Sequence, residues 1–107
     1  MTFELRTYTA ASGKMEALLE RFRTHTTKLF PDHGIQDIGY WISDEDPEAL
    51  IYLVRHEGDP KSNWEGFKAD PRWVAARAAS VEDGELTDNI SSLYLTATDF
   101  SPVRPAQ

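Results

Sequence analysis

The hydrophobic pattern changes its period early in the chain, and this change limits the folds that the sequence can adopt. Residues 3–10 alternate in character and are rich in β-branched and aromatic side chains, which predicts a strand. Residues 11–13 (Ala-Ser-Gly) interrupt it. From residue 14 to 30 the apolar side chains fall on one helical stripe, and Pro31 and Gly34 are expected to end this helix.

The rest of the chain repeats this alternation of elements. Asp59-Pro60 and Asp70-Pro71 each combine a capping side chain with proline at the first helical position, so each predicts a helix start. Further strands are predicted over 35–43, 49–57 and 87–98, with a polar turn at 44–47. The order βαββαβ predicts an α+β, ferredoxin-like fold, in which helices cover one face of an antiparallel four-stranded sheet.

The composition is that of one small domain. We expect a single domain over residues 1–107, with residues 98–107 as a C-terminal tail. The absence of cysteine excludes a disulfide scaffold and a thiolate metal site. The net charge of −7 disfavours partners rich in phosphate, so we expect no nucleic-acid or membrane partner. No signal or membrane-spanning pattern is found, which favours a cytoplasmic location.

One face of the predicted sheet is unusually aromatic and polar. With regular alternation it carries Arg6, Tyr8, Trp41, Tyr52, His56, Ile90, Ser92 and Tyr94. We place this set on the face without helices. A patch of this kind is typical of an interface or a ligand cavity, so we predict a two-fold homodimer whose sheets face each other and enclose a cavity. Isolated surface tyrosines on strands are the alternative interpretation.

Several short motifs resemble those of one family. The segment 64–73 reads W-x-x-F-x-x-D-P-x-W, residues 4–8 read Glu-Leu-Arg-Thr-Tyr before Gly13-Lys14, and His33-Gly34-Ile35 leads to Gly39-Tyr40-Trp41. The ending, from Leu95 to Pro102, continues the match. Together these residues resemble the NIPSNAP family across nearly the whole chain. The resemblance implies a homodimeric α/β-barrel fold and leaves the chemistry undefined, because the family is poorly characterised biochemically.

The candidate catalytic residues are His25, Arg6 and Tyr8. His25 lies three residues after Phe22 on the apolar stripe of the first helix, where it could titrate at the mouth of a cavity. A histidine hydrogen-bonded at the edge of the core is the alternative. Arg6 could hold a carboxylate or enolate oxygen and Tyr8 could donate a proton, although an ion pair between subunits explains Arg6 equally well.

A second group could line a pocket for a flat hydrophobic molecule. The candidate ligand-binding residues are Tyr40, Trp41, His56, Trp64, Phe67, Trp73 and Tyr94. For the helical members of this group, a role in the core is the alternative interpretation. The histidines lack metal-ligand spacing, so we expect no metal and no cofactor. Haem held by one histidine, as in some dimeric α/β barrels, is the alternative.

These observations favour a homodimeric NIPSNAP-like protein that binds a small aromatic or lipophilic molecule in a cavity between sheet and helices. The first alternative is a cofactor-independent monooxygenase, isomerase or cyclase of the dimeric-barrel type. Such enzymes need mainly a dry pocket, a base and a donor to an oxyanion. The second alternative is a protein-interaction module. Polar groups that converge on a cavity would favour the enzyme, and a filled interface would favour the interaction module.

Overall fold

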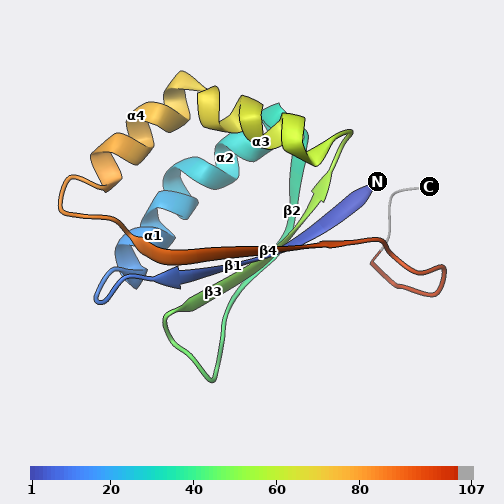
Figure 1. Ribbon diagram of the computed structural model, residues 1–107, viewed down its shortest axis with the longest axis horizontal. Coiled ribbons are helices and arrows are strands. Elements are labelled where there is room, and N and C mark those ends of the chain that lie inside the picture. The colour runs from blue at the N-terminus through green and yellow to red at the C-terminus, as the bar shows by residue number, and fades with distance from the viewer. Residues whose placement is uncertain (104–107) are drawn as a thin grey trace.

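The computed structural model describes residues 1–103 and confirms the predicted order of elements (Figure 1). Residues 104–107, the end of the predicted tail, lie outside the described residues. The strands are β1 (Thr2–Ala10), β2 (Ile35–Ile42), β3 (Ala49–His56) and β4 (Thr87–Leu95). The long helical region comprises α1 (Met15–Arg21), η1 (Phe22–Thr26), α2 (Thr27–Leu29) and η2 (Phe30–His33), and the later helices are α3 (Pro60–Ala69) and α4 (Pro71–Ser80).

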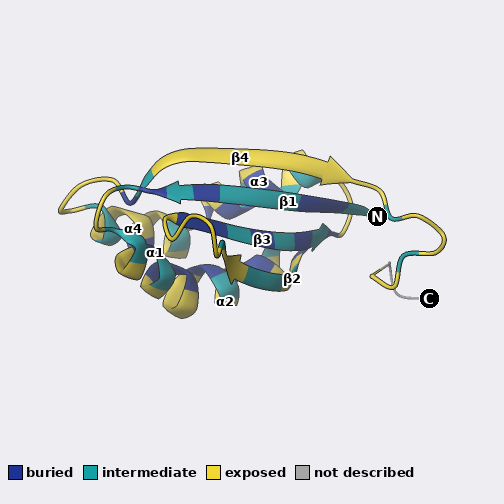
Figure 2. Cartoon of the chain, turned by 90° about the horizontal axis from the view of Figure 1, so that it is seen from below, coloured by how far each residue is buried: buried dark blue, intermediate teal, exposed yellow. Residues whose placement is uncertain are grey.

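The sheet is antiparallel and has the order β2-β3-β1-β4, as expected for the ferredoxin-like fold. The helices cover one face of it (Figures 1 and 2). Strands β1 and β3 are central and largely buried or half-buried, whereas β4 is an exposed edge along almost its whole length (Figure 2). No helix among residues 1–103 is long and apolar enough to cross a bilayer.

The predicted alternation of side chains along the strands is confirmed, but we placed most of the aromatic and polar set on the wrong face of the sheet. The register pairs Arg6 with Tyr52 on one side and with Ser92 on the other, so these residues share a face. Tyr8 and Tyr52 on this face belong to the core that the helices cover. The predicted patch therefore faces the helices. Arg6 and His56 can lie there because both contact the buried carboxylate of Glu4, and Arg6 also donates to Tyr8 and Tyr52. Composition alone does not show these contacts.

Trp41 is the exception within that patch. The pairing of β2 with β3 shifts between Asp37 and Gly39, which leaves Ile38 as an extra residue. Beyond this bulge Tyr40 faces the helices and Trp41 faces the opposite way, where it is 54% exposed. The indole covers Gly39, whose position would place a Cβ only 2.6 Å from the ring. Trp41 therefore lies on the face without helices, where we placed it, but regular alternation groups it wrongly with Arg6 and Tyr8.

The first helix contains a π-helical segment, and this corrects the predicted position of His25. The N–H of Thr27 donates to the carbonyl of Phe22, five residues earlier. In the wider turn Thr26 is buried and His25 is exposed. Regular helical spacing predicts His25 on the apolar stripe, but the π segment turns it outward.

The later helix boundaries follow from their caps. The Asp59 side chain accepts from the N–H of Ser62, and the Asp70 side chain accepts from the N–H of Arg72. The first helical region ends at Gly34, which has φ of 73° and so takes the left-handed conformation that favours glycine. His33 forms a contact between elements, with Nε2 at 2.8 Å from Asp70 Oδ2, rather than capping its own helix.

The face without helices carries a group of apolar side chains, together with polar ones such as Thr7, Ser91 and Arg55. Leu93 is 57% exposed, and Leu5, Ile51 and Leu53 are half-buried beside it on neighbouring strands. Phe3 on the same face is buried, and it lines a hollow together with Thr96, Ala97, Thr98, Ser101 and Val103. We call the set Leu5, Trp41, Ile51, Leu53 and Leu93 the open-face patch.

Candidate functional site

A polar network lies between the sheet and the helices. Glu4 is fully buried on β1 and accepts hydrogen bonds from Arg6 at 2.8 Å and from the indole N–H of Trp64 at 2.8 Å. His56 Nε2 lies 2.7 Å from Glu4 Oε1, the oxygen that also accepts from Trp64, and Ser92 donates to Oε2, the oxygen that also accepts from Arg6. The carboxylate of Glu4 thus neutralises the charge of Arg6 inside the fold.

The hydrogen bonds of this network determine the charge of Glu4. Burial alone would raise the pKa of Glu4, but hydrogen bonds from His56, Ser92, Trp64 and Arg6 lower it to about 2. His56 is itself fully buried and its second ring nitrogen, Nδ1, lies 3.1 Å from the amide of Asn63. His56 is therefore a partner within the network and does not line the pocket described next.

The network orients the hydroxyl group of Tyr8. Arg6 Nε donates to the Tyr52 hydroxyl at 2.8 Å, and Tyr52 donates to the Tyr8 hydroxyl at 3.1 Å. Arg6 also donates to Tyr8 at 3.3 Å. Burial, together with Tyr8, raises the pKa of Tyr52 well above its usual value, so Tyr52 remains a neutral donor. Because the Tyr8 oxygen accepts two hydrogen bonds, its own proton is directed elsewhere.

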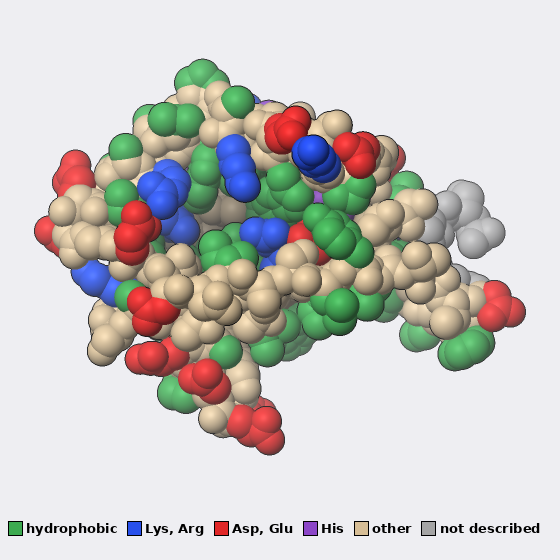
Figure 3. Space-filling model, viewed as in Figure 1, with side chains coloured by type: hydrophobic (Ala, Val, Ile, Leu, Met, Phe, Trp, Pro, Cys, Tyr) green, Lys and Arg blue, Asp and Glu red, His purple; other side chains and the backbone are tan. Residues whose placement is uncertain are grey.

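Tyr8 and Arg6 form part of the wall of a cavity of about 650 Å³ between the helices and β4. This size is within the usual range for small-molecule sites. Figure 3 shows the hollow, with Lys and Arg side chains at its rim and inside it. We call it the helix-face pocket; its lining is Arg6, Tyr8, Arg21, Trp64, Phe67, Lys68, Trp73, Val74, Arg77, Ala78, Glu85, Thr87 and Ile90.

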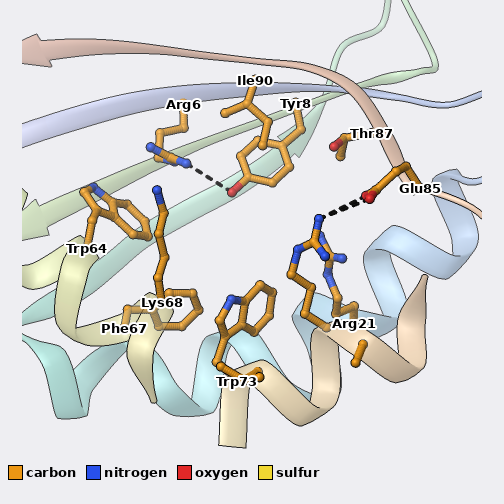
Figure 4. Close-up of a pocket in the computed structure, with 13 residues that line it drawn as sticks. Arg6, Tyr8, Arg21, Trp64, Phe67, Lys68, Trp73, Glu85, Thr87 and Ile90 are labelled. Carbon is orange, nitrogen blue, oxygen red and sulfur yellow. Dashed lines mark hydrogen bonds and ion pairs between the residues drawn. The ribbon is translucent and has the colours of Figure 1, made fainter. Parts of the chain in front are cut away.

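Aromatic side chains form the floor of the helix-face pocket, as Figure 4 shows. Trp73 lies 4.7 Å from Phe67 between ring centroids, and Phe67 lies 5.8 Å from Trp64. The guanidinium of Arg6 is 4.2 Å from the Trp64 ring centroid, which is a cation–π distance. An apolar floor with polar groups at its edges is the usual form of a site for a small organic molecule.

The structure brings together part of the predicted site. Arg6, Tyr8, Trp64, Phe67 and Trp73 line the helix-face pocket. The remaining predicted residues lie outside its lining: His25 is exposed on η1, Trp41 is on the open face, and His56 is in the Glu4 network. Tyr40 packs against Phe22, and Tyr94 lines a neighbouring hollow that shares Arg6, Trp64 and Lys68 with the pocket.

Sequence reasoning predicted Arg6 but missed the other three cations of the pocket, Arg21, Lys68 and Arg77. Arg21 follows Leu18 by three residues, Lys68 follows Trp64 by four, and Arg77 follows Trp73 by four. Residues at these spacings share a helix face. These spacings place each cation on the apolar face of its helix, and this is the sequence signal that could have identified the three residues. Glu4 was also missed as a site residue, because its partners lie far away in the sequence.

The fold and the pocket define a ferredoxin-like α+β protein with a ligand-sized cavity on the helix side of its sheet. Its sequence matches the family model named NIPSNAP over residues 3–102, so the chain belongs to the NIPSNAP family. This confirms the resemblance seen in the motifs. No curated protein matches the sequence.

Solved structures of similar proteins support the fold. A NIPSNAP family protein from Agrobacterium tumefaciens is 25% identical, with a TM-score of 0.77 and coverage of 96% of this chain and 98% of that chain. An uncharacterized NIPSNAP domain protein from Burkholderia xenovorans is 21% identical, with a TM-score of 0.77 and coverage of 96% and 100%.

A more distant likeness links the fold to another class. A protein from Nitrosomonas europaea that is proposed to be an antibiotic biosynthesis monooxygenase is 14% identical, with a TM-score of 0.63. The match covers 91% of this chain and 98% of that chain. At this identity the likeness concerns the fold alone, and the biochemical activity of the NIPSNAP-family chain stays undefined.

Proposed function

We propose that this NIPSNAP-family protein binds a small aromatic or lipophilic molecule in the helix-face pocket. The observation that carries the proposal is the combination of an aromatic floor, formed by Trp64, Phe67 and Trp73, with the oriented hydroxyl of Tyr8. The floor would bury the apolar body of the ligand, and the Tyr8 hydroxyl would donate to an oxygen on it.

Thermal unfolding with a small panel of compounds tests this proposal. The panel contains 2-naphthol, naphthalene-2-carboxylate, decanoate and haem. A ligand present at 100 times its Kd adds about 2.7 kcal/mol to the free energy of unfolding. For a domain of this size we expect the Tm to rise by more than about 5 °C with at least one compound.

Two alanines on α4 provide matched variants for this test. Ala78 lines the pocket, whereas Ala75 is exposed on the same helix and is not part of the lining. Ala78→Phe should fill the pocket and abolish the thermal shift, and Ala75→Phe should leave it unchanged. The proposal fails if no compound raises the Tm, or if both variants respond to the compound as the original protein does.

We also propose that the chain forms a homodimer through the open-face patch. Large apolar side chains cluster there, and Trp41 and Leu93 are more than half exposed. A two-fold axis would place the same patch on both sides of the contact, so each apolar group would meet an apolar group. The fold of the family supports this arrangement, which replaces the predicted chamber between the sheets with a packed contact.

A cofactor-independent oxygenase or isomerase is the second candidate function. It is favoured by one observation, namely the Tyr8 hydroxyl held by Arg6 and Tyr52 at the pocket wall. Among residues 1–103, no histidine lines this pocket to act as a base. Oxygen uptake with naphthols tests the candidate: an enzyme requires turnover that Tyr8→Phe removes, whereas a binding protein shows binding without uptake.

A further inference from the structure

The helix-face pocket is positively charged in a protein whose net charge is −7. Its lining contains Arg6, Arg21, Lys68 and Arg77 but only one carboxylate, that of Glu85. Glu85 pairs with Arg77 at 3.1 Å, and both side chains of this pair are about half exposed or more. Glu4 neutralises Arg6. The excess charge of the pocket therefore rests on Arg21 and Lys68.

Arg21 is the unusual member of this set. It is only 8% exposed, yet its charge has no carboxylate partner among residues 1–103. The guanidinium donates one hydrogen bond from NH1 to the Ser80 hydroxyl at 3.1 Å and lies 5.1 Å from the Trp73 ring centroid. Within the described chain, its Nε atom is buried without a hydrogen-bond partner.

A buried guanidinium without a counter-ion is costly, because removing a charge from water is compensated only by pairing. Burial lowers the pKa of Arg21, and the nearby charge of Arg77 lowers it further. The carboxylate of Glu85 acts in the opposite direction, but it pairs with Arg77 and forms no ion pair with Arg21. An arginine nevertheless stays protonated at neutral pH. A ligand carrying a negative group next to Trp73 would supply the missing partner.

We infer that the helix-face pocket takes a monocarboxylic acid with an apolar body, and that Arg21 binds its carboxylate. The inference deepens the proposed function and rests on it. The planar guanidinium suits a carboxylate, to which it can donate in parallel. Figure 4 shows Arg21 at one end of the pocket and Trp64 and Phe67 at the other, so the apolar body would lie along the aromatic floor.

Matched pairs of probes separate charge from shape. Isothermal titration calorimetry compares naphthalene-2-carboxylate with naphthalene-2-carboxamide, which has nearly the same shape and no charge. We expect the carboxylate to bind at least tenfold more tightly, because hydrogen bonds to charged groups are the stronger ones. Decanoate and decanamide form the corresponding aliphatic pair, and the better pair shows whether the apolar body is an aromatic ring or an alkyl chain.

Substitutions of Arg21 locate the effect. Arg21→Met should weaken carboxylate binding roughly ten- to a hundredfold and leave carboxamide binding nearly unchanged. Arg21→Lys should retain part of the preference. Ser80→Ala removes the hydrogen bond to Arg21 without removing the charge, so it should keep the preference for the acid. Because Arg21→Met also removes an unpaired buried charge, its Tm without ligand should equal or exceed that of the original protein.

The outcomes are distinct. Equal binding of acid and amide, or a preference that survives Arg21→Met, overturns the inference and leaves the pocket as a site for neutral molecules. A fall in Tm of Arg21→Met without ligand, together with equal loss of acid and amide binding, would show that Arg21 is structural. Failure of all four probes to bind would overturn the inference, and the proposed function falls as well only if 2-naphthol and haem also leave the Tm unchanged.

Discussion

The two faces of the sheet are built from different chemistry. The helix side of β1 and β3 carries Glu4 and Tyr52, which are buried, and Arg6, which is partly buried and hydrogen-bonded to both of them. The opposite side carries Leu5, Ile51 and Leu53, which need only to be removed from water. This difference shows that the helices can cover the more polar face of a sheet. Hydrophobicity alone does not decide which face of a sheet the helices cover, because partnered charges can be buried.

The largest effect is expected from breaking the network on the helix side. Glu4→Ala would leave Arg6 buried without its carboxylate partner, and breaking a buried pair in this way costs about 3–5 kcal/mol. Urea unfolding followed by circular dichroism measures the loss. Glu45→Ala, which removes an exposed carboxylate in the turn before β3, is the control and should change the free energy of unfolding by less than about 0.5 kcal/mol. Equal effects of the two variants would contradict the account.

The dependence of stability on pH tests whether the ionised carboxylate of Glu4 stabilises the fold. The pKa of Glu4 is lowered from 4.5 to about 2 in the folded state, so its ionised form stabilises the fold. This contribution is fully present above pH 4.5 and is lost as the pH falls toward 2. Glu4→Gln should therefore lose less stability between pH 5 and about pH 2.5 than the original protein does. Parallel curves for the two proteins would show that Glu4 does not contribute.

A substitution on the open face should weaken dimerisation without unfolding the monomer. Leu93→Asp would place a charge in the proposed dimer contact, at a side chain that is 57% exposed in the single chain. We expect the free energy of dimerisation to become less favourable by about 2 kcal/mol for each substituted copy, while the monomer stays folded. Analytical ultracentrifugation at micromolar concentration measures this, with Ala75→Glu on α4 as the control. A monomeric original protein, or a Leu93→Asp dimer of unchanged affinity, would disprove the contact.

Substitutions of two tryptophans, one on each face of the sheet, allow the roles of the two faces to be compared directly. Trp73 lines the helix-face pocket and Trp41 lies on the open face. Trp73→Ala should weaken binding of naphthalene-2-carboxylate about tenfold, because an aromatic contact of this kind contributes about 1 kcal/mol beyond the buried area. Trp41→Ala should leave this Kd unchanged and weaken dimerisation instead. The reverse pattern, measured by calorimetry and ultracentrifugation, would exchange the roles of the faces.

The smallest effect is expected at His25, which belongs to neither face. Its side chain is exposed on η1, so His25→Ala should change the free energy of unfolding by less than about 0.5 kcal/mol and leave ligand binding unchanged. The same calorimetric titration tests this. A tenfold loss of binding would restore His25 to the site from which the structure separates it.

The fold could be predicted from the sequence because its signals are local. The Asp59-Pro60 and Asp70-Pro71 pairs define helix starts, and both carboxylates do cap the following helix. The faces and the site could not be predicted equally well, because they depend on irregularities and on distant partners. The bulge at Ile38 places Trp41 on the face opposite Arg6 and Tyr8, and the π turn places His25 on the exposed side of its helix.

The lining of the pocket was predicted in part. Trp64, Phe67 and Trp73 follow from a helical motif and line the pocket, as does Arg6, whereas the predicted Tyr40, Trp41 and Tyr94 do not. Glu4 meets partners 52 and 60 residues away in the chain, and no local pattern shows these contacts. Arg21 had a local signal, namely a cation on an apolar helical stripe. The meaning of this signal depends on the tertiary structure, in which Arg21 forms no ion pair with a carboxylate of residues 1–103.

Amide chemical shifts measured during a titration with naphthalene-2-carboxylate test the central claim, that the ligand site lies on the helix side and the open face serves association. The ¹⁵N-labelled protein should show saturable shifts at Arg6, Tyr8 and along α3 and α4, with a shift of the Arg21 Nε–H signal. Leu53 and Leu93 should stay unchanged. Saturable shifts confined to the open-face patch would contradict the claim.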